Sequence, residues 1–168
     1  MFAPLFSVED DQLVQFVIYG HPLPKERARA FQANGHIHFY NKSRNHELRF
    51  QDATKEVMGG LLHGKSTYFR SKFLEVSLLF SFRRPDYHFV GGNRASGILD
   101  NDVIAFPSHT DVDNLCKFVL DSLNGVMYND DSRVVGLLVG KEWAWDPISP
   151  GSTSVKIRAV KPEYRFVL

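Results

Sequence analysis

The sequence predicts a single α+β domain in which a mostly antiparallel mixed sheet and two main helices form two layers. Three observations predict this fold. Segments rich in β-branched and aromatic residues recur between turn signals. Two longer segments carry apolar residues at helical spacing. A chain of 168 residues with 43% hydrophobic residues is long enough for one buried core. We expect one domain over residues 1–168, with a tail at 1–12.

The first third of the chain predicts three strands. Residues 13–19 read LVQFVIY, an apolar and β-branched run typical of a strand. The next four residues, His-Pro-Leu-Pro, cannot pair within a sheet and indicate a turn or an edge. Residues 33–40 contain an Asn-Gly hairpin signal, followed by strand-like alternation. We therefore expect a hairpin before the first helix.

A first helix is expected over residues 44–62. Ser43 is a suitable N-cap, and Gly64 lies just beyond the expected end. The predicted core-facing positions of this helix are Leu48, Ala53, Val57, Leu61 and Leu62.

The second half predicts a strand, a long loop, a helix and two strands. Residues 72–82 read as a strand that becomes more buried toward its end. Residues 83–109 lose periodicity and contain several Gly and Pro, so we expect a functional or mobile loop. A helix follows over 115–123, then strands at 134–139 and 154–160, which gives the order β-β-β-α-β-α-β-β. The predicted core-facing stripe of this second helix is Leu115, Phe118, Val119 and Ser122/Leu123.

Composition points to a protein that works inside the cell. Cys116 is the single cysteine, so no disulfide can form within the chain. Residues 1–11 carry three acids and no base, unlike a secretory signal or transit peptide. No run reaches 18 apolar residues, which excludes a membrane span. We expect a cytoplasmic location, or one associated with the nucleoid or nucleus.

Charge is divided along the chain although the net charge is only +1. Residues 100–131 hold seven acids and one Lys. Residues 20–49 hold six Lys or Arg against two acids, and residues 65–84 hold five against one. An acidic centre within a basic frame suits an enzyme that neutralises the centre with a cation while the frame holds a polyanion.

Four acids bracket the second predicted helix, in the run TDVDNLCKFVLDSLNGVMYNDDSR. Asp111 and Asp113 precede its apolar stripe, whereas Asp130 and Asp131 follow an Asn-Gly turn. Neighbouring carboxylates repel one another, which favours a bound cation. Hard oxygen ligands favour Mg²⁺ or Mn²⁺ over Zn²⁺. The alternative is a solvated acidic loop with helix-capping and turn-forming aspartates.

Lys117 is the one Lys or Arg within residues 100–131. It lies four residues from both Asp113 and Asp121, and helical spacing places the three on one face. Lys117 could form a surface ion pair with Asp121, or it could stabilise charge on a phosphate beside a metal. Cys116 is expected to be a buried small side chain rather than a nucleophile.

The acidic run resembles the RusA family of Holliday-junction resolvases. The signature DxDNxxK, a D-x-L-N-G step and a DD pair are all present, and GHPLPKERAR is similar to the family's G-x-P-x-x-K-x-R segment. The resemblance implies that Asp111, Asp113 and Asp131 bind the metal and that Lys117 is catalytic. It also implies a homodimer that cuts four-way DNA junctions by paired nicks with Mg²⁺ or Mn²⁺.

Two departures from the family pattern concern the substrate. His109-Thr110 replaces the usual basic residue and Pro, and the loop at 83–109 is longer than usual. Asp121 and Asp130 are candidates for carboxylates that lie just outside the metal ligands and support them. Our candidates for contacts with the DNA backbone are Lys25, Arg27, Arg29, Arg83 and Arg84. The alternatives are a metal-dependent nuclease or phosphotransferase that acts on other branched DNA or RNA, and a non-catalytic DNA-binding module.

Overall fold

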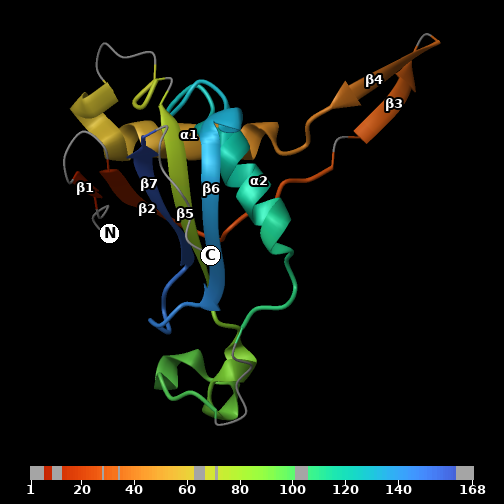
Figure 1. Cartoon of the computed structure of the whole chain (residues 1–168). Helices are drawn as coiled ribbons and strands as arrows, with labels where there is room; N and C mark the ends of the chain where they lie inside the picture. Colours follow the sequence, from red (N-terminus) through yellow and green to blue (C-terminus); the bar gives the residue numbers. More distant parts are fainter. Residues whose placement is uncertain are drawn as a thin grey trace.

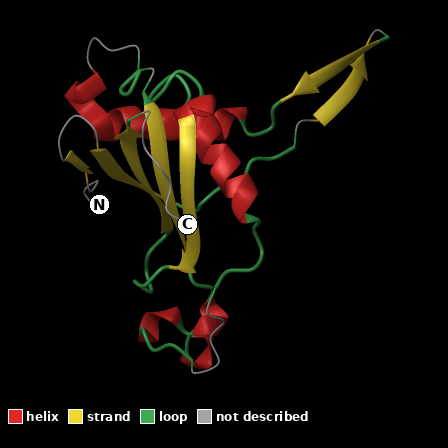
Figure 2. Cartoon of the chain, viewed as in Figure 1, coloured by secondary structure: helices red, strands yellow, loops and turns green. Residues whose placement is uncertain are grey.

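The computed structural model describes residues 6–8, 13–27, 29–33, 35–62, 67–70, 72–100 and 106–161. Its main elements are β1 (Phe6–Val8), β2 (Leu13–Tyr19), β3 (Arg29–Ala33), β4 (His36–Tyr40), α1 (Arg44–Met58), β5 (Phe73–Phe82), α2 (Val112–Leu123), β6 (Val134–Trp143) and β7 (Gly151–Val160). Figures 1 and 2 show a five-stranded sheet with both helices beside it, and a separate hairpin of β3 and β4 that projects from the body.

The sheet has the strand order β1-β2-β7-β5-β6. Neighbouring strands are antiparallel except for β5 and β6, which run parallel. This confirms the predicted α+β fold with a mostly antiparallel mixed sheet. Alternate residues of β5 and β7 are buried, as expected for a sheet with one covered face. The core-facing residues of β5 are Leu74, Val76, Leu78, Phe80 and Phe82.

The first helix differs from the prediction in its end and its buried face. It ends at Met58, where Gly59 adopts a positive φ of 50°, and a short 3-10 turn (Gly59–Leu62) follows. The side chain of Ser43 makes no capping hydrogen bond. The predicted stripe was right only in part: Val57, Leu61 and Leu62 are partly buried against the core, whereas Leu48 is exposed. The buried residues of α1 are Glu47, Phe50, Thr54 and Met58. Apolar periodicity missed this face because two of its four residues are polar.

The second helix follows the prediction closely. Every residue of its predicted stripe is buried, and so is Cys116. Burial raises the pKa of the Cys116 thiol, which disfavours the thiolate and agrees with a structural role. The strands at the C-terminal end were predicted in the right places, but β6 and β7 are each ten residues long. A short strand, β1, lies within the stretch expected to be a tail.

The composition of the segment after β5 suggested a loop without regular structure, but the segment is partly ordered. It forms three short 3-10 turns, Asp86–His88, Val90–Gly92 and Arg94–Ser96. His88 and Phe89 are buried within it. Figure 1 shows this segment in green at one end of the sheet. Residues 101–105 of the predicted loop lie outside the described part of the chain. Among the described helices, none is long and apolar enough to cross a membrane.

Candidate functional site

Asp111 and Asp113 begin helix α2. Asp111 is its N-cap residue with extended backbone angles, and its carbonyl accepts a hydrogen bond from the Leu115 amide at 3.2 Å. Its side chain makes no capping hydrogen bond. Both carboxylates are exposed, and within the described part of the chain neither has a hydrogen bond or ion pair. The positive end of the helix dipole favours negative charge here. The two carboxylates are therefore available to a ligand.

Contacts just before Asp111 fix where α2 begins. The Lys141 ammonium, near the end of β6, donates to the carbonyl oxygen of Thr110 at 2.6 Å. The ring of His109 contacts Phe82, the last residue of β5, with ring centroids 5.1 Å apart. It also contacts Trp143, the last residue of β6, at 5.9 Å. The acidic pair is thus held at the end of the sheet where β5 and β6 finish.

Lys117 lies one helical turn after Asp113 on the exposed side of α2. It has no hydrogen bond or ion pair with the described residues, so the possible Lys117–Asp121 pair is not formed. Asp121 instead pairs with Lys25, with Nζ and Oδ2 2.7 Å apart. The Lys117 ammonium is therefore available for an anionic ligand, as Asp111 and Asp113 are for a cation.

Lys25 also pairs with Glu47, a buried residue of α1 that the sequence did not single out. The Asn41 amide donates to both carboxylate oxygens of Glu47, at 3.1 and 3.0 Å. Burial disfavours the Lys25 ammonium, but hydrogen bonds to Asp121 and Glu47 outweigh it and raise the pKa of Lys25. The sequence could have indicated that Glu47 is buried, because Glu47 lies three residues before Phe50 and therefore on the same helix face.

Asp130 and Asp131 lie just before β6. The Asp130 carboxylate accepts a hydrogen bond from the Ser132 amide at 2.9 Å, and hydrogen bonding to Ser132 lowers the pKa of Asp130. Asp130 therefore has the turn-forming role that was the alternative reading of the motif. Asp131 is half-buried. Burial raises the pKa of the Tyr128 hydroxyl, and the charges of Asp131 and Asp121 raise it further, so both carboxylates lie within electrostatic reach of Tyr128.

The structure does not bring Asp131 together with Asp111 and Asp113. Asp111 lies at the start of α2, next to the end of β6, whereas Asp131 follows α2 and directly precedes β6. A helix of twelve residues is about 18 Å long. Among the described residues, no group of three or more His, Cys, Asp or Glu is arranged to hold a metal ion. The predicted carboxylates therefore form two separate groups in one chain.

Comparison with known proteins identifies the family. Residues 19–158 match the family described as endodeoxyribonuclease RusA. The chain belongs to the RusA family. It is also similar to the Bacillus subtilis (strain 168) protein named "Uncharacterized protein YqaN". The two are 27% identical over 152 residues, which cover 80% of this chain and 90% of the relative. The matched region contains α1 and α2, the strands β3 to β6 and most of β7, but only the last residue of β2.

The basic residues expected to contact DNA in this RusA family member differ in their surroundings. Arg27 and Arg83 are exposed. Arg29 begins β3, but its side chain lies outside the described part of the structure. Arg84 turns inward, where its Nε donates to the Ala144 carbonyl at 2.9 Å and burial lowers its pKa. Lys25 is occupied by two carboxylates. Arg27 and Arg83 are thus the best placed of the five for a phosphate contact.

Proposed function

We propose that this protein is a Mg²⁺- or Mn²⁺-dependent endodeoxyribonuclease that resolves four-way DNA junctions by paired, symmetric nicks. Membership of the RusA family supports a nuclease that acts on DNA. Within this chain, the main support for the proposal is that three charged side chains at the start and on the exposed side of α2 are unpaired within the described part of the structure. Asp111, Asp113 and Lys117 are all exposed, and none has a partner among the described residues.

Asp111 and Asp113, with Asp131, are the residues we expect to hold the metal. Their chemistry fits, because they supply only hard oxygen donors and Mg²⁺ commonly takes just one or two carboxylates from the protein. When bound, a divalent cation polarises a phosphoryl oxygen and lowers the pKa of an attacking water. The carboxylates would offset the charge of the cation and fix its position at the start of α2.

Lys117 is suited to act on the phosphate itself. Its position one turn from Asp113 would let the ammonium donate a hydrogen bond to a phosphate oxygen beside the cation. A positive group in this place stabilises negative charge that develops during hydrolysis. Exposed basic residues such as Arg27 and Arg83 would hold the flanking backbone by neutralising phosphates. Each of these residues then has a role that its surroundings in the structure allow.

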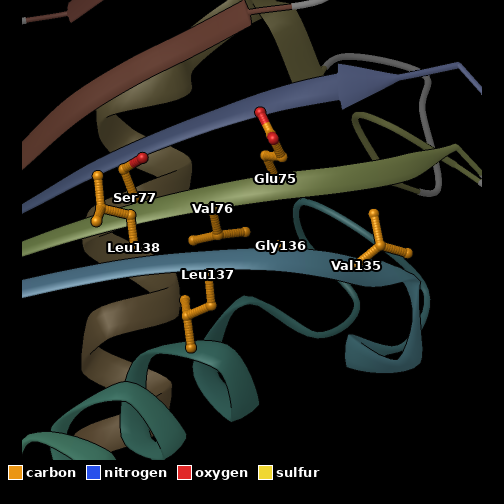
Figure 3. A pocket seen from close by; sticks show the side chains of 7 residues that line it. All are labelled: Glu75, Val76, Ser77, Val135, Gly136, Leu137 and Leu138. Carbon is orange, nitrogen blue, oxygen red and sulfur yellow. The ribbon is translucent and has the colours of Figure 1, made fainter. Parts of the chain in front are cut away.

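A homodimer would suit a substrate that must be cut twice, because a two-fold enzyme matches a two-fold junction. The exposed edge of β6 is a candidate interface. It is ten residues long, and no described strand pairs with its outer side. Its exposed residues include Leu137 at 47% and Leu138 at 71%. Long apolar edge strands readily pair with another chain. Figure 3 shows the hollow beside them, which is lined by Glu75, Val76, Ser77, Val135, Gly136, Leu137 and Leu138.

Antiparallel pairing of two β6 strands would also unite the separated carboxylates. In such a pair the beginning of one strand lies beside the end of the other. Asp131 precedes the beginning of β6, and the Thr110–Lys141 hydrogen bond holds Asp111 near its end. Asp131 of one copy would therefore approach Asp111 and Asp113 of the other copy. This arrangement would account for carboxylates that share one predicted role but lie apart in a single chain.

The experiment that tests the proposed function is cleavage of a synthetic four-way junction beside a linear duplex of the same sequence, with and without Mg²⁺. We expect paired nicks in opposite arms of the junction, only with the metal, and little cleavage of the duplex. Branched DNA flaps and RNA hairpins are included as further substrates. Preferential cleavage of either would assign the protein to another class of nuclease, and binding without cleavage of any substrate would make it a DNA-binding module.

A further inference from the structure

The β3–β4 hairpin stands apart from the rest of the molecule. Figure 1 shows it projecting clear of the sheet and of both helices. Its two strands pair from Arg29↔Tyr40 to Ala33↔His36, and Ile37 is 65% exposed. An isolated two-stranded hairpin is at best marginally stable in water. A projecting hairpin with an exposed apolar residue is therefore expected to gain stability by contact with a partner.

The segments that lead into β3 and out of β4 form the root of this hairpin. Side chains fix this root to both helices. Lys25, in the segment that leads into β3, pairs with Glu47 of α1 and with Asp121 of α2. Asn41, which directly follows β4, donates to Glu47 as well. The backbone amide of Lys25 also donates to the carbonyl of Asn114 in α2, at 2.8 Å. One buried carboxylate thus joins the two sides of the root.

Further hydrogen bonds connect the two sides directly. The Glu26 amide donates to the hydroxyl of Ser43 at 2.8 Å, which explains why this hydroxyl does not cap α1. Lys42 pairs with the Glu26 carboxylate at 2.8 Å. The hairpin consequently leaves the body in a direction set by α2, the helix that carries Asp113 and Lys117.

The charge of the hairpin and its flanks indicates the kind of partner. Residues 27–46 contain no Asp or Glu, but they include four Lys or Arg and three His. All four Lys or Arg lie near the root, and residues 30–39 contain none. An acid-free stretch with basic residues at its base matches a polyanion. A two-stranded ribbon also fits the major groove of DNA, which is about 12 Å wide.

We infer that the β3–β4 hairpin is a DNA-binding arm whose tip enters a groove while the arginines at its root contact phosphates. Lys25 and Glu47 then act as positioning residues that hold the arm at a fixed angle to α2. This inference rests on the proposed function, in that it takes DNA as the substrate. It adds a second contact region, separate from the acidic residues of α2.

The test compares two changes that affect different parts of the arm. In the first variant, an Asn-Gly turn replaces residues 30–39, which removes the tip but no Lys or Arg. In the second, Arg27→Ala and Arg29→Ala remove two charges at the root and leave the tip intact. Binding to a four-way junction is measured without metal at several salt concentrations. The control carries Lys55→Ala and Lys156→Ala, which remove two exposed charges from α1 and β7.

If the hairpin is a DNA-binding arm, the two variants should give different results. The shortened variant should bind at least 10-fold more weakly with an unchanged salt dependence, because no phosphate contact is lost. The arginine variant should show a shallower dependence, by about 0.9 in the slope of log K against log salt for each lost contact. The control should keep the wild-type slope. Circular dichroism and thermal melting should show that the shortened variant retains the folded body.

Two results would overturn the inference. One is a shortened variant that is folded and binds the junction within twofold of the wild type. The other is a shortened variant that becomes monomeric where the wild type is dimeric, because the hairpin would then bind a second copy of the chain. Cleavage by the wild type is measured in parallel. If one of these two results is found and the wild type still cuts junctions, only the inference about the hairpin fails and the proposed function stands. If the wild type neither binds nor cuts junctions, the proposed function itself is refuted.

Discussion

The two ends of helix α2 present carboxylates in opposite states. At its start, Asp111 and Asp113 are exposed and have no partner among the described residues. Near its end, Asp121 pairs with Lys25, which also holds the buried Glu47. Residue type alone does not distinguish the two groups. A carboxylate that already has a cationic partner stabilises the fold, whereas one held in place without a partner is suited to a ligand.

The largest expected effect tests the unpaired group. Asp111→Asn should remove detectable cleavage of a four-way junction while leaving binding intact or tighter, because it removes a metal ligand and also reduces repulsion toward phosphate. The melting temperature should hardly change, since the Asp111 side chain makes no capping hydrogen bond. A variant that nicks junctions at the wild-type rate would exclude Asp111 from the active site.

The next effect concerns the unpaired cation on the same helix. Lys117→Ala should lower the turnover number about 100-fold, the typical effect of removing one group that stabilises transition-state charge. Thermal stability should stay close to that of the wild type, because Lys117 has no partner among the described residues. Single-turnover cleavage and thermal melting measure the two quantities. Loss of stability with full activity would assign Lys117 to the fold instead.

The paired group should give the reverse pattern. Lys25→Met keeps most of the side-chain volume but leaves the Glu47 carboxylate, 3% exposed, without its cation. Breaking a buried pair from one side costs about 3 kcal/mol or more in the free energy of unfolding. Urea denaturation measures this change, and Lys25→Met combined with Glu47→Gln should recover part of the loss. An unchanged free energy in the single variant would contradict the structural role of the pair.

This pair also predicts a pH dependence. The pKa of Lys25 is raised in the folded protein above its ordinary value of 10.5. Its contribution to stability is therefore complete below pH 10.5 and is lost as pH rises through the folded pKa. The difference in the free energy of unfolding between wild type and Lys25→Met should thus be constant from pH 7 to 10 and shrink at higher pH. A difference that grows above pH 10.5 would have the wrong sign.

The smallest effect is expected at the fourth aspartate of the motif. Asp130 is fully exposed, and its carboxylate accepts a hydrogen bond from the Ser132 amide. Asp130→Asn keeps an acceptor in the same place, so activity and melting temperature should both stay close to wild type. Cleavage assays that compare this variant with Asp131→Asn would separate the two adjacent residues. A severe loss in Asp130→Asn would mean that this carboxylate also serves the active site.

The sequence predicted those parts of the molecule that depend on local patterns. The strand at residues 72–82, more buried toward its end, and the stripe from Leu115 to Leu123 both follow from local patterns, and both were predicted correctly. The pairing of Lys25 with Glu47 and Asp121 joins three segments distant in sequence, and no local pattern encodes it. The separation of Asp131 from Asp111 depends on how α2 lies along β6, which the motif does not reveal.

In the proposed dimer, one active site takes carboxylates from two copies of the chain. Asp111→Asn and Asp131→Asn chains with different tags can be co-expressed, and the mixed dimer purified through both tags. If the two active sites are shared between copies, one site of the mixed dimer carries both mutations and the other site carries neither. Sites built within single chains would each carry one mutation.

Nicking of a four-way junction by this mixed dimer distinguishes shared active sites from sites built within single chains. We predict that each variant is inactive alone, and that the mixed dimer cuts one strand of the junction without making the paired second cut. A mixed dimer that is intact by light scattering and binds the junction, but leaves both strands uncut, would contradict the shared site.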